Sequence, residues 1–182
     1  MKFTSLEPAD LILIEPDVHP DARGFFLEFF HAEKYAAAGI HGPFVQDNHS
    51  RSARGTLRGL HAQLRHPQAK LLRVVTGEIW DVAVDIRVGS PTFGRYAAVT
   101  LTAENYKQLY VPVGFAHGFC VMSDWAEVEY KTTDFYDPGG ELRLRWDDPE
   151  LAIPWPVRDP ILSPKDAVAA SLAELMPQLP RL

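Results

Sequence analysis

The chain has 182 residues, which is enough for one domain with a sizeable hydrophobic core, and we expect a single domain over residues 1–182. Hydrophobic residues make up 46% of the sequence, which predicts a packed globule rather than a disordered chain. The formal net charge of -6 argues against a nucleic-acid-binding protein, because neutralising the phosphates of a strand requires a basic face. A nucleotide ligand is still compatible with this charge, since it needs only a few local Arg and Lys side chains.

Cysteine usage and hydropathy indicate the setting of the protein. Cys120 is the single cysteine, so no intrachain disulfide can form, and we expect a reduced, cytoplasmic setting. Residues 1–10 lack an uninterrupted apolar run followed by a small-residue cleavage site, so we expect no signal peptide. No apolar stretch approaches the length of a membrane span, so we expect no membrane partner.

The 12 Gly and 15 Pro residues punctuate short segments, as is typical of an all-β fold. In chain order, the sequence predicts a helix over 32–38 and strands over 70–76, 78–87, 95–101, 108–111, 117–122 and 127–133. A second helix is predicted to open at Ser163-Pro164, because Ser at the N-cap and Pro at the first helical position are strong start signals. Many short strands with regular turns favour a barrel or jelly roll over a parallel α/β fold.

Alternation along two predicted strands indicates which side chains share a face. In the first, Trp80, Val82, Val84 and Ile86 alternate with Ile79, Asp81, Ala83 and Asp85. In the second, Ala126, Val128 and Tyr130 alternate with Glu127, Glu129 and Lys131. Tyr130 is therefore expected to face the interior, where its phenol can reach a bound substrate.

Two histidines resemble parts of the metal site that many cupin-type barrels hold. The His-x-His pair of such sites is broken, because His61 is followed by Ala62 and Gln63, and Glu78 lies beyond the usual spacing. His117, which follows a Pro-x-Gly turn, is a poor site by itself, because first-row metals need about three protein ligands. We therefore expect no bound catalytic metal.

Proton transfer suits these residues better. A neutral histidine such as His61 titrates close to physiological pH and is the most frequent general base. The ammonium of Lys70 can stabilise a developing enolate, and Tyr130 is a candidate for returning the proton on the opposite face. Asp166, in the first turn of the predicted C-terminal helix, would fix the tautomer of His61 and raise its basicity if the two side chains pair.

A set of ordered motifs spans nearly the whole chain. These motifs are 21–28, 46–50, 57–61, 70–74, 81–87, 90–94, 112–119, 130–133, 146–149 and 162–166. In this order they resemble the dTDP-4-dehydrorhamnose 3,5-epimerase family, enzymes of dTDP-L-rhamnose synthesis. The resemblance implies an all-β, cupin-type double-stranded β-helix, a jelly-roll barrel, with short peripheral helices.

The resemblance implies roles for individual residues. His61 would remove protons next to the C4 ketone of the sugar with Asp166 as its partner, while Lys70 stabilises the enolate and Tyr130 reprotonates it. Substrate-binding roles are implied for Arg23, Glu28, Gln46, Asn48, Arg58, His117, Tyr136, Glu141 and Lys165. In that set, Arg23 and Arg58 would hold the diphosphate through bidentate contacts, and Tyr136 would stack on thymine.

The implied enzyme is a metal-independent isomerase. It would convert dTDP-4-dehydro-6-deoxy-D-glucose to dTDP-4-dehydro-β-L-rhamnose by enolate-mediated inversion at C3 and C5. No cofactor is expected, because the C4 ketone supplies the acidity. The family is dimeric with exchanged N-terminal strands, so the resemblance also implies a homodimer in which Arg23 and Glu28 serve the partner's site.

Two features depart from the family pattern, Ala62 and the Asp137-Pro-Gly-Gly140 loop before Glu141, and Arg58 raises a separate question of strand geometry. Ala62 stands where the family usually has an aromatic residue, which opens space beside His61. Strict alternation also places Arg58 on the opposite face of its strand from His61, so a bulge or twist must intervene if both serve one site.

Alternatives are open for the function and for single residues. A single-centre epimerase or a ketoisomerase of a related dTDP-deoxysugar pathway would keep the same base, although His61 together with Tyr130 favours inversion. A non-catalytic sugar-nucleotide-binding cupin and a metal-dependent cupin oxygenase are further alternatives. Lys70 can also be a strand-edge charge, Tyr130 a core tyrosine, and Asp166 a carboxylate that only complements a helix dipole.

Overall fold

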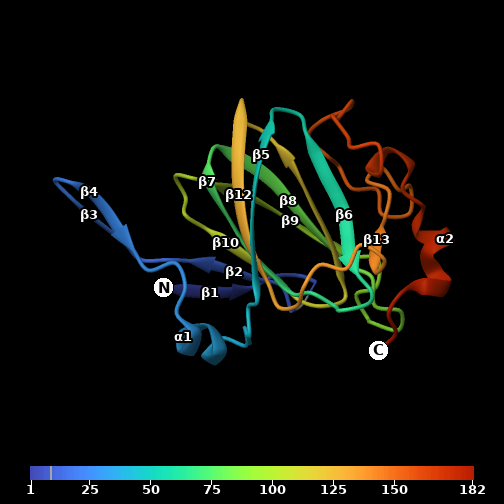
Figure 1. Ribbon diagram of the computed structural model, residues 1–182, viewed down its shortest axis with the longest axis horizontal. Helices are drawn as coiled ribbons and strands as arrows, with labels where there is room; N and C mark the ends of the chain where they lie inside the picture. The colour runs from blue at the N-terminus through green and yellow to red at the C-terminus, as the bar shows by residue number, and fades with distance from the viewer. Residues whose placement is uncertain (9) are drawn as a thin grey trace.

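The computed structural model describes residues 1–8 and 10–182, which form two antiparallel sheets facing each other and a separate hairpin (Figure 1). The six-stranded sheet has the order β1 (Lys2–Ser5), β2 (Ile12–Glu15), β10 (Gln108–Val111), β7 (Lys70–Thr76), β12 (Trp125–Thr132) and β5 (Gln46–Ala53). The five-stranded sheet has the order β13 (Glu141–Arg143), β6 (Leu57–Gln63), β11 (Phe115–Val121), β8 (Glu78–Asp85) and β9 (Tyr96–Thr102).

The connectivity is that of a jelly roll. From β5 to β8, and again from β9 to β13, the chain passes from one sheet to the other at every step. Between β5 and β13, only the β8–β9 connection joins two consecutive strands that are paired in the same sheet. The predicted all-β jelly-roll barrel is therefore confirmed, and residues far apart in sequence meet between the sheets.

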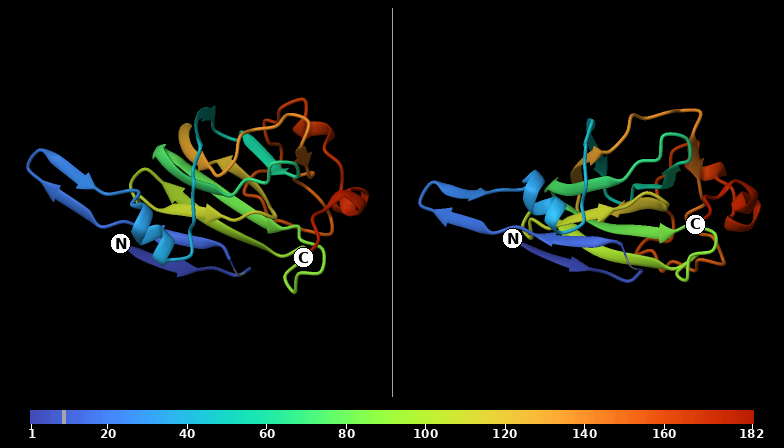
Figure 2. Two further views of the ribbon diagram at one scale, coloured as in Figure 1. Left: turned by 60° about the horizontal axis from the view of Figure 1, so that its bottom comes forward. Right: turned by 90° about the horizontal axis from the view of Figure 1, so that it is seen from below.

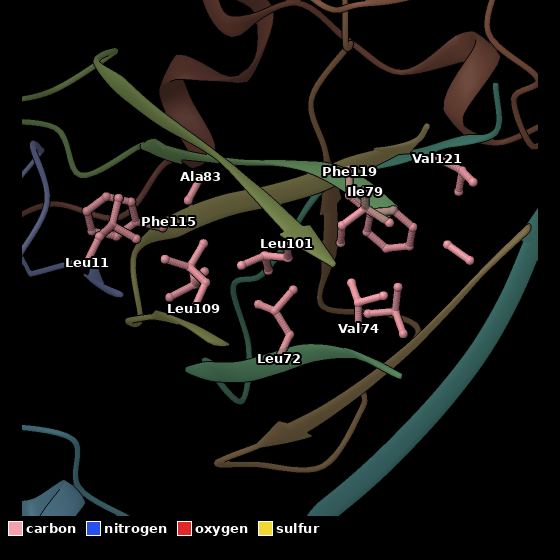
Figure 3. Close-up of a cluster of buried hydrophobic side chains, with 13 residues drawn as sticks. Leu11, Leu72, Val74, Ile79, Ala83, Leu101, Leu109, Phe115, Phe119 and Val121 are labelled. Carbon is pink, nitrogen blue, oxygen red and sulfur yellow. The ribbon is translucent and has the colours of Figure 1, made fainter. Parts of the chain in front are cut away.

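The main hydrophobic core lies between the two sheets (Figure 3). Leu72 and Val74 of β7 enter it from the six-stranded sheet, and Ile79 and Ala83 of β8 enter it from the other sheet. Because alternate residues of a strand share a face, Asp81 of β8 lies on this same inner face.

Strand β12 presents its predicted face to the core. Ala126 and Val128 are buried in the core cluster, and Tyr130 packs against it. The alternate residue Lys131 instead bonds to Asp47 on the outer face of the sheet. The prediction that Tyr130 faces the interior is confirmed.

The outer faces of both sheets are also covered. On the five-stranded sheet, Val82 and Val84 pack with Leu172 and Leu175 of the C-terminal segment. On the six-stranded sheet, helix α1 (Ala32–Ala37) places the fully buried Tyr35 in a third cluster. The predicted helix over 32–38 is thus confirmed.

Most predicted strand bounds agree with the structure. The predictions for 70–76 and 108–111 coincide with β7 and β10. The strand predicted over 78–87 ends earlier, at Asp85, where the carboxylate bonds to the backbone and side chain of Arg87 and stops the ladder.

The prediction of a C-terminal helix opening at Ser163 is wrong. The segment forms only the single turn η1 (Asp166–Val168), and α2 (Leu172–Leu175) and η2 (Met176–Gln178) follow later. Ala169 is extended, and the backbone N–H of Arg145 donates to the carbonyl of Ala170, which ties this stretch beside Leu144 instead of letting the helix continue. Ser163 still contacts the start of the turn, because its hydroxyl accepts the backbone N–H of Asp166.

The hairpin of β3 (Val18–Asp21) and β4 (Gly24–Leu27) projects away from the barrel (Figures 1 and 2). The two strands pair only with each other, as a separate two-stranded sheet. Phe25 and Phe26 near its tip are 57% and 70% exposed. The hairpin therefore carries large apolar surface that its own barrel does not cover.

Candidate active site

A cavity of about 590 Å³ opens between the sheets, within the range typical of small-molecule sites (roughly 300–1,000 Å³). Strands β5, β6, β7, β11, β12 and β13 and the segment 161–166 line it. The predicted site residues that line it are Gln46, Asn48, Arg58, His61, Lys70, His117, Tyr130, Tyr136, Glu141 and Asp166. Residues spread over 120 positions of sequence are therefore gathered around one space by the jelly-roll connectivity.

A bulge in β6 brings Arg58 and His61 to the same cavity. His117 of β11 lies opposite His61, but Phe119 lies opposite Arg58, so β6 advances one residue further than β11 between the two pairs. This extra residue reverses the alternation, as the sequence required. Gly59 permits it, since its φ is +121° and a Cβ there would lie 2.6 Å from the Cα of Gly118.

His61 and Asp166 form a tight pair at the edge of the cavity. The Nε2 of His61 lies 2.6 Å from the Oδ1 of Asp166, whose side chain is buried. Burial acts to raise the pKa of Asp166, but the bond from His61 and further bonds from Ser163 and the Gly59 N–H lower it below its usual value. Because a carboxylate only accepts hydrogen bonds, Nε2 carries the proton, and Nδ1 is left as the basic nitrogen.

Lys70 brings a cation into the cavity from the first position of β7. Burial lowers the pKa of its ammonium to about 8, and attraction to Asp81 and Glu141 opposes this lowering. No carboxylate of residues 1–8 and 10–182 lies within 4.0 Å of its Nζ. The ammonium is thus mostly protonated at neutral pH, and its donors are free to approach an oxyanion.

Tyr130 of β12 supplies a phenol to the same cavity. Burial raises the pKa of the phenol, Arg58 opposes the rise, and Glu141 adds to it. The hydroxyl therefore stays protonated at neutral pH. In the part of the chain that the structure describes, no protein group hydrogen-bonds to this hydroxyl, so the proton is available to a ligand.

Polar groups surround the mouth of the cavity. The side-chain amide of Gln46 donates to Asn48, and the backbone N–H of Tyr136 donates to Gln46. The hydroxyl of Tyr136 donates to Glu141. This chain of bonds holds the half-exposed Tyr136 ring beside the opening, in a position suited to stacking on a planar base.

A second histidine–carboxylate pair lies deeper. The Nε2 of His117 lies 2.9 and 3.0 Å from the two carboxylate oxygens of Asp81, and both side chains are almost fully buried. The sequence analysis gave Asp81 no role in the site. A signal was present, since a charged residue that alternates with Ile79 and Ala83 on the inner face of its strand needs a partner, but alternation alone does not identify that partner.

Three predicted binding residues lie elsewhere. Arg23 sits near the tip of the hairpin, 90% exposed and bonded to Asp21. Glu28 pairs with Lys34 of α1, and Lys165 is an exposed residue next to Asp166. None of the three lines this chain's cavity, so their binding roles remain predictions. Ala62 borders the cavity, while its methyl group packs in the cluster on the outer face of β6.

Within residues 1–8 and 10–182, no three His, Cys, Asp or Glu side chains come together as a set of metal ligands. In the same residues, no helix has the length and apolar character needed to cross a membrane. The groups that do converge are a histidine base, an ammonium and a phenol around one space. Such a set can move protons at a carbon next to a carbonyl while the charge on oxygen is stabilised.

A family model described as dTDP-4-dehydrorhamnose 3,5-epimerase matches residues 5–174. A dTDP-4-dehydrorhamnose 3,5-epimerase of Pseudomonas aeruginosa is 53% identical over 176 residues, covering 96% of this chain and 97% of that protein. A dTDP-4-dehydrorhamnose 3-epimerase of Streptomyces niveus is 42% identical over 164 residues, covering 88% of this chain and 79% of that protein.

A solved structure gives a similar result. The dTDP-6-deoxy-D-glucose-3,5-epimerase of Legionella pneumophila, determined in complex with dTDP-4-keto-L-rhamnose, has a TM-score of 0.96 and 48% identity. The match covers 100% of this chain and 98% of that one. The likeness therefore extends over both sheets, the hairpin and the segments that line the cavity.

Proposed function

The chain belongs to the dTDP-4-dehydrorhamnose 3,5-epimerase family, and from this premise we propose that it inverts C3 and C5 of dTDP-4-dehydro-6-deoxy-D-glucose to give dTDP-4-dehydro-β-L-rhamnose. One observation carries the proposal: the His61–Asp166 pair, Lys70 and Tyr130 line the same cavity. These are the base, the oxyanion partner and the acid that an epimerisation next to a ketone requires.

The reaction begins with loss of a carbon-bound proton. With its Nε2 proton held by Asp166, the Nδ1 of His61 takes the proton from the carbon next to the C4 ketone. The electron pair of that C–H bond forms the enolate double bond, and the carbonyl electrons move onto O4. The ammonium of Lys70 stabilises the negative charge on O4.

Inversion requires the proton to return on the other face. The phenol of Tyr130 donates its proton to the enolate carbon, so the configuration of that carbon is reversed. Solvent exchange then returns Tyr130 to the phenol and His61 to the neutral base. The same sequence repeats at the second carbon, and no redox cofactor takes part because the reaction has no net oxidation.

The nucleotide is bound at the mouth of the cavity in this proposal. Arg58 contacts the diphosphate, Gln46 and Asn48 bond to the nucleoside, and Tyr136 stacks on thymine. His117, Glu141 and Lys165 complete the contacts to the ligand. Each role follows from the family motifs and from the position of the residue in or beside the lining.

The assembly is a homodimer that exchanges its N-terminal hairpins. The support is the projecting β3–β4 hairpin, whose Phe25 and Phe26 are exposed and need a cover. Arg23 and Glu28 do not line their own cavity, so a place in the other subunit's site gives them a ligand to contact. Light scattering coupled to gel filtration should give twice the monomer mass.

Mixed dimers test the sharing of sites. Arg23→Ala and His61→Asn subunits should each be inactive or weak alone. Co-expression pairs an intact Arg23 with an intact His61 in one of the two sites of a mixed dimer. Random pairing should restore about a quarter of the wild-type activity. If the mixture stays as inactive as its parents, Arg23 does not act in the other subunit's site.

The decisive test of the reaction is turnover in deuterated water. NMR should show deuterium and inverted configuration at both C3 and C5 of the sugar. The His61→Asn variant should still bind dTDP but should show no deuterium exchange at either carbon. If the protein only binds sugar nucleotides, the wild type itself should show no exchange. Absence of exchange at both carbons in the wild type would overturn the proposal.

A single-centre epimerase is the second candidate. The observation that favours it is the 42% identity to a Streptomyces niveus protein named as a 3-epimerase. Deuterium and inversion at one carbon alone in the same experiment would establish it. The metal-dependent oxygenase alternative is tested by metal analysis of the purified protein, which should contain no stoichiometric ion.

The setting is the reducing cytoplasm. The single Cys120 is fully buried, and burial raises the pKa of its thiol to about 11, so it behaves as a small hydrophobic residue and not as a disulfide former. Cell fractionation should recover the protein with the soluble cytoplasmic enzymes.

A further inference from the structure

Asp81 is a buried carboxylate that the steps above do not use. It lies on the inner face of β8 and is fully buried. Among residues 1–8 and 10–182, the ring of His117 is the only hydrogen-bond partner of its side chain. Burying a carboxylate with a single hydrogen-bond partner costs several kcal/mol in free energy of folding, so a second, functional interaction is expected.

The geometry at His117 fixes the state of its ring. Both carboxylate oxygens lie within hydrogen-bond distance of Nε2, so the Nε2 proton points between them. In the strand register, His117 lies opposite Ala83 and Phe119 lies opposite Asp81, which makes the pair a diagonal contact on one face. The ring is thereby held in a single orientation at the cavity wall.

Asp81 also acts on the Lys70 ammonium electrostatically, beyond the 4.0 Å range of a direct ion pair. Asp81 is close enough to attract its ammonium, and this attraction opposes the effect of burial. The other titratable and charged side chains around the same cavity are Arg58, His61, Tyr130, Tyr136, Glu141 and Asp166. Of these, only Glu141 also holds the Lys70 ammonium in its charged form.

We propose that Asp81 is a positioning residue of the epimerase site, whose carboxylate orients the His117 ring and supplies the main negative charge facing the Lys70 ammonium. This inference rests on the proposed function. Lys70 stabilises the enolate only while it is protonated, so Asp81 extends the pH range of activity upward. Asp81 itself contacts neither substrate nor reacting atoms in this scheme, since it lies behind His117 and does not line the cavity.

The test variant is Asp81→Asn, which keeps the shape and removes the charge. We expect kcat to fall about 10- to 100-fold, with a smaller change in KM, because one component of oxyanion stabilisation is weakened. The alkaline limb of the kcat profile should move to lower pH by about one unit, since loss of a nearby negative charge favours the neutral amine. Tyr130 ionises at higher pH than Lys70, so it does not set this limb.

Asp85→Asn is the matched control. Asp85 lies on the same strand, is equally buried, and is held by Arg87, Ser90 and Thr92 away from the cavity. Its variant should lose thermal stability and leave the alkaline limb unmoved. If the alkaline limb of the Asp81→Asn profile superimposes on that of wild type, the inference is wrong. The same holds if Asp81→Asn and Asp85→Asn move this limb equally.

A second readout separates this inference from the function itself. Reductive 13C-methylation of lysines and NMR titration, with Lys70→Arg to assign the signal, measures the Lys70 pKa without turnover. The pKa should be lower in Asp81→Asn than in wild type, and no change would overturn the inference. Lack of wild-type turnover would instead overturn the proposed function alone. If Asp81→Asn does not fold, Asp81→Ser carries the same expected shift.

Discussion

Two histidine–carboxylate pairs lie side by side on neighbouring strands and differ in what surrounds them. His61 of β6 and His117 of β11 are opposite each other in the strand register, and both donate Nε2–H to a buried carboxylate. The side chain of His61 is 28% exposed, whereas that of His117 is 10% exposed. The first ring therefore has an open edge toward the cavity, and the second is enclosed between Asp81 and the core.

Pairing with a carboxylate does not by itself make a histidine a general base. A carboxylate that accepts the Nε2 proton orients either ring. Only the ring with an accessible second nitrogen can take a proton from a ligand, and the enclosed ring is limited to holding a fixed hydrogen-bonding group at the wall. This difference supports the proposed roles, in which His61 transfers protons and His117 is held in a fixed orientation.

The largest effect should follow from removing the open ring. His61→Asn should lower kcat by about 10³- to 10⁴-fold, because general base catalysis is lost. Binding of dTDP, measured by titration calorimetry, should be unchanged. His117→Asn should cost less in kcat than His61→Asn, and the reverse order would contradict the assignment of the two rings.

Removing the cation should have the next largest effect. Lys70→Met should lower kcat by about 10²- to 10³-fold, the loss typical of one oxyanion-stabilising group. The pKa of Lys70 is about 8 because of burial, and activity needs the ammonium. Wild-type kcat should therefore fall as pH rises through about 8, and this limb should be absent from the profile of the variant. A limb that persists unchanged would show that another group titrates there.

The carboxylate of the open pair should matter somewhat less. Asp166→Asn should lower kcat by about 10²-fold, because an amide at this position can donate to Nε2 and leave the Nδ1 of His61 protonated. Asp147→Asn is the control, since Asp147 is a partly exposed carboxylate of the C-terminal half that pairs with Arg145 outside the cavity. Steady-state kinetics of both variants, with circular dichroism to verify folding, would compare them. Equal losses would argue for a general effect on the fold.

The smallest kinetic effect should come from a third buried carboxylate, Asp85. Burial acts to raise its pKa, but bonds from Arg87, Ser90 and Thr92 lower it to about 2. Its stabilising contribution is therefore present above the usual pKa near 4 and is lost as pH falls toward 2. Asp85→Asn should lower the free energy of unfolding at pH 7 by about 1–3 kcal/mol, with kcat unchanged. Denaturant unfolding should show the gap to wild type closing below pH 4, and a gap that stays constant would contradict this linkage.

Sequence patterns predicted those strands of the barrel in which the side chains of one face are more buried than those of the other. The bounds of β7 and β10 and the inward face of Tyr130 followed from alternation, which the packing of two sheets imposes directly. The helix expected at Ser163 failed, because a backbone bond from Arg145 to Ala170 outweighs good capping residues. The β3–β4 hairpin was not predicted from alternation, since it belongs to neither sheet of the barrel and its Phe25 and Phe26 are exposed instead of buried.

The residues of the candidate site could be predicted where a family motif contains them. His61, Lys70, Tyr130 and Asp166 do line one cavity, but their meeting depends on contacts between strands far apart in sequence. The partner of Asp81 lies 36 residues away on β11, and no local pattern contains that distance. Likewise, the bulge that turns Arg58 toward His61 depends on the close approach of Gly59 and Gly118.

The Asp166 carboxylate reaches His61 across 105 residues of sequence, on a segment tied to the barrel by the backbone bonds of Ile161 with Gly55 and Leu57. During synthesis on the ribosome, the sheets that carry His61, Lys70 and Tyr130 emerge well before this segment does. A nascent chain with a closed barrel would therefore hold a base that lacks its counter-ion. Under the proposed mechanism, catalytic competence is therefore acquired late in translation, after the strands that line the cavity have been made.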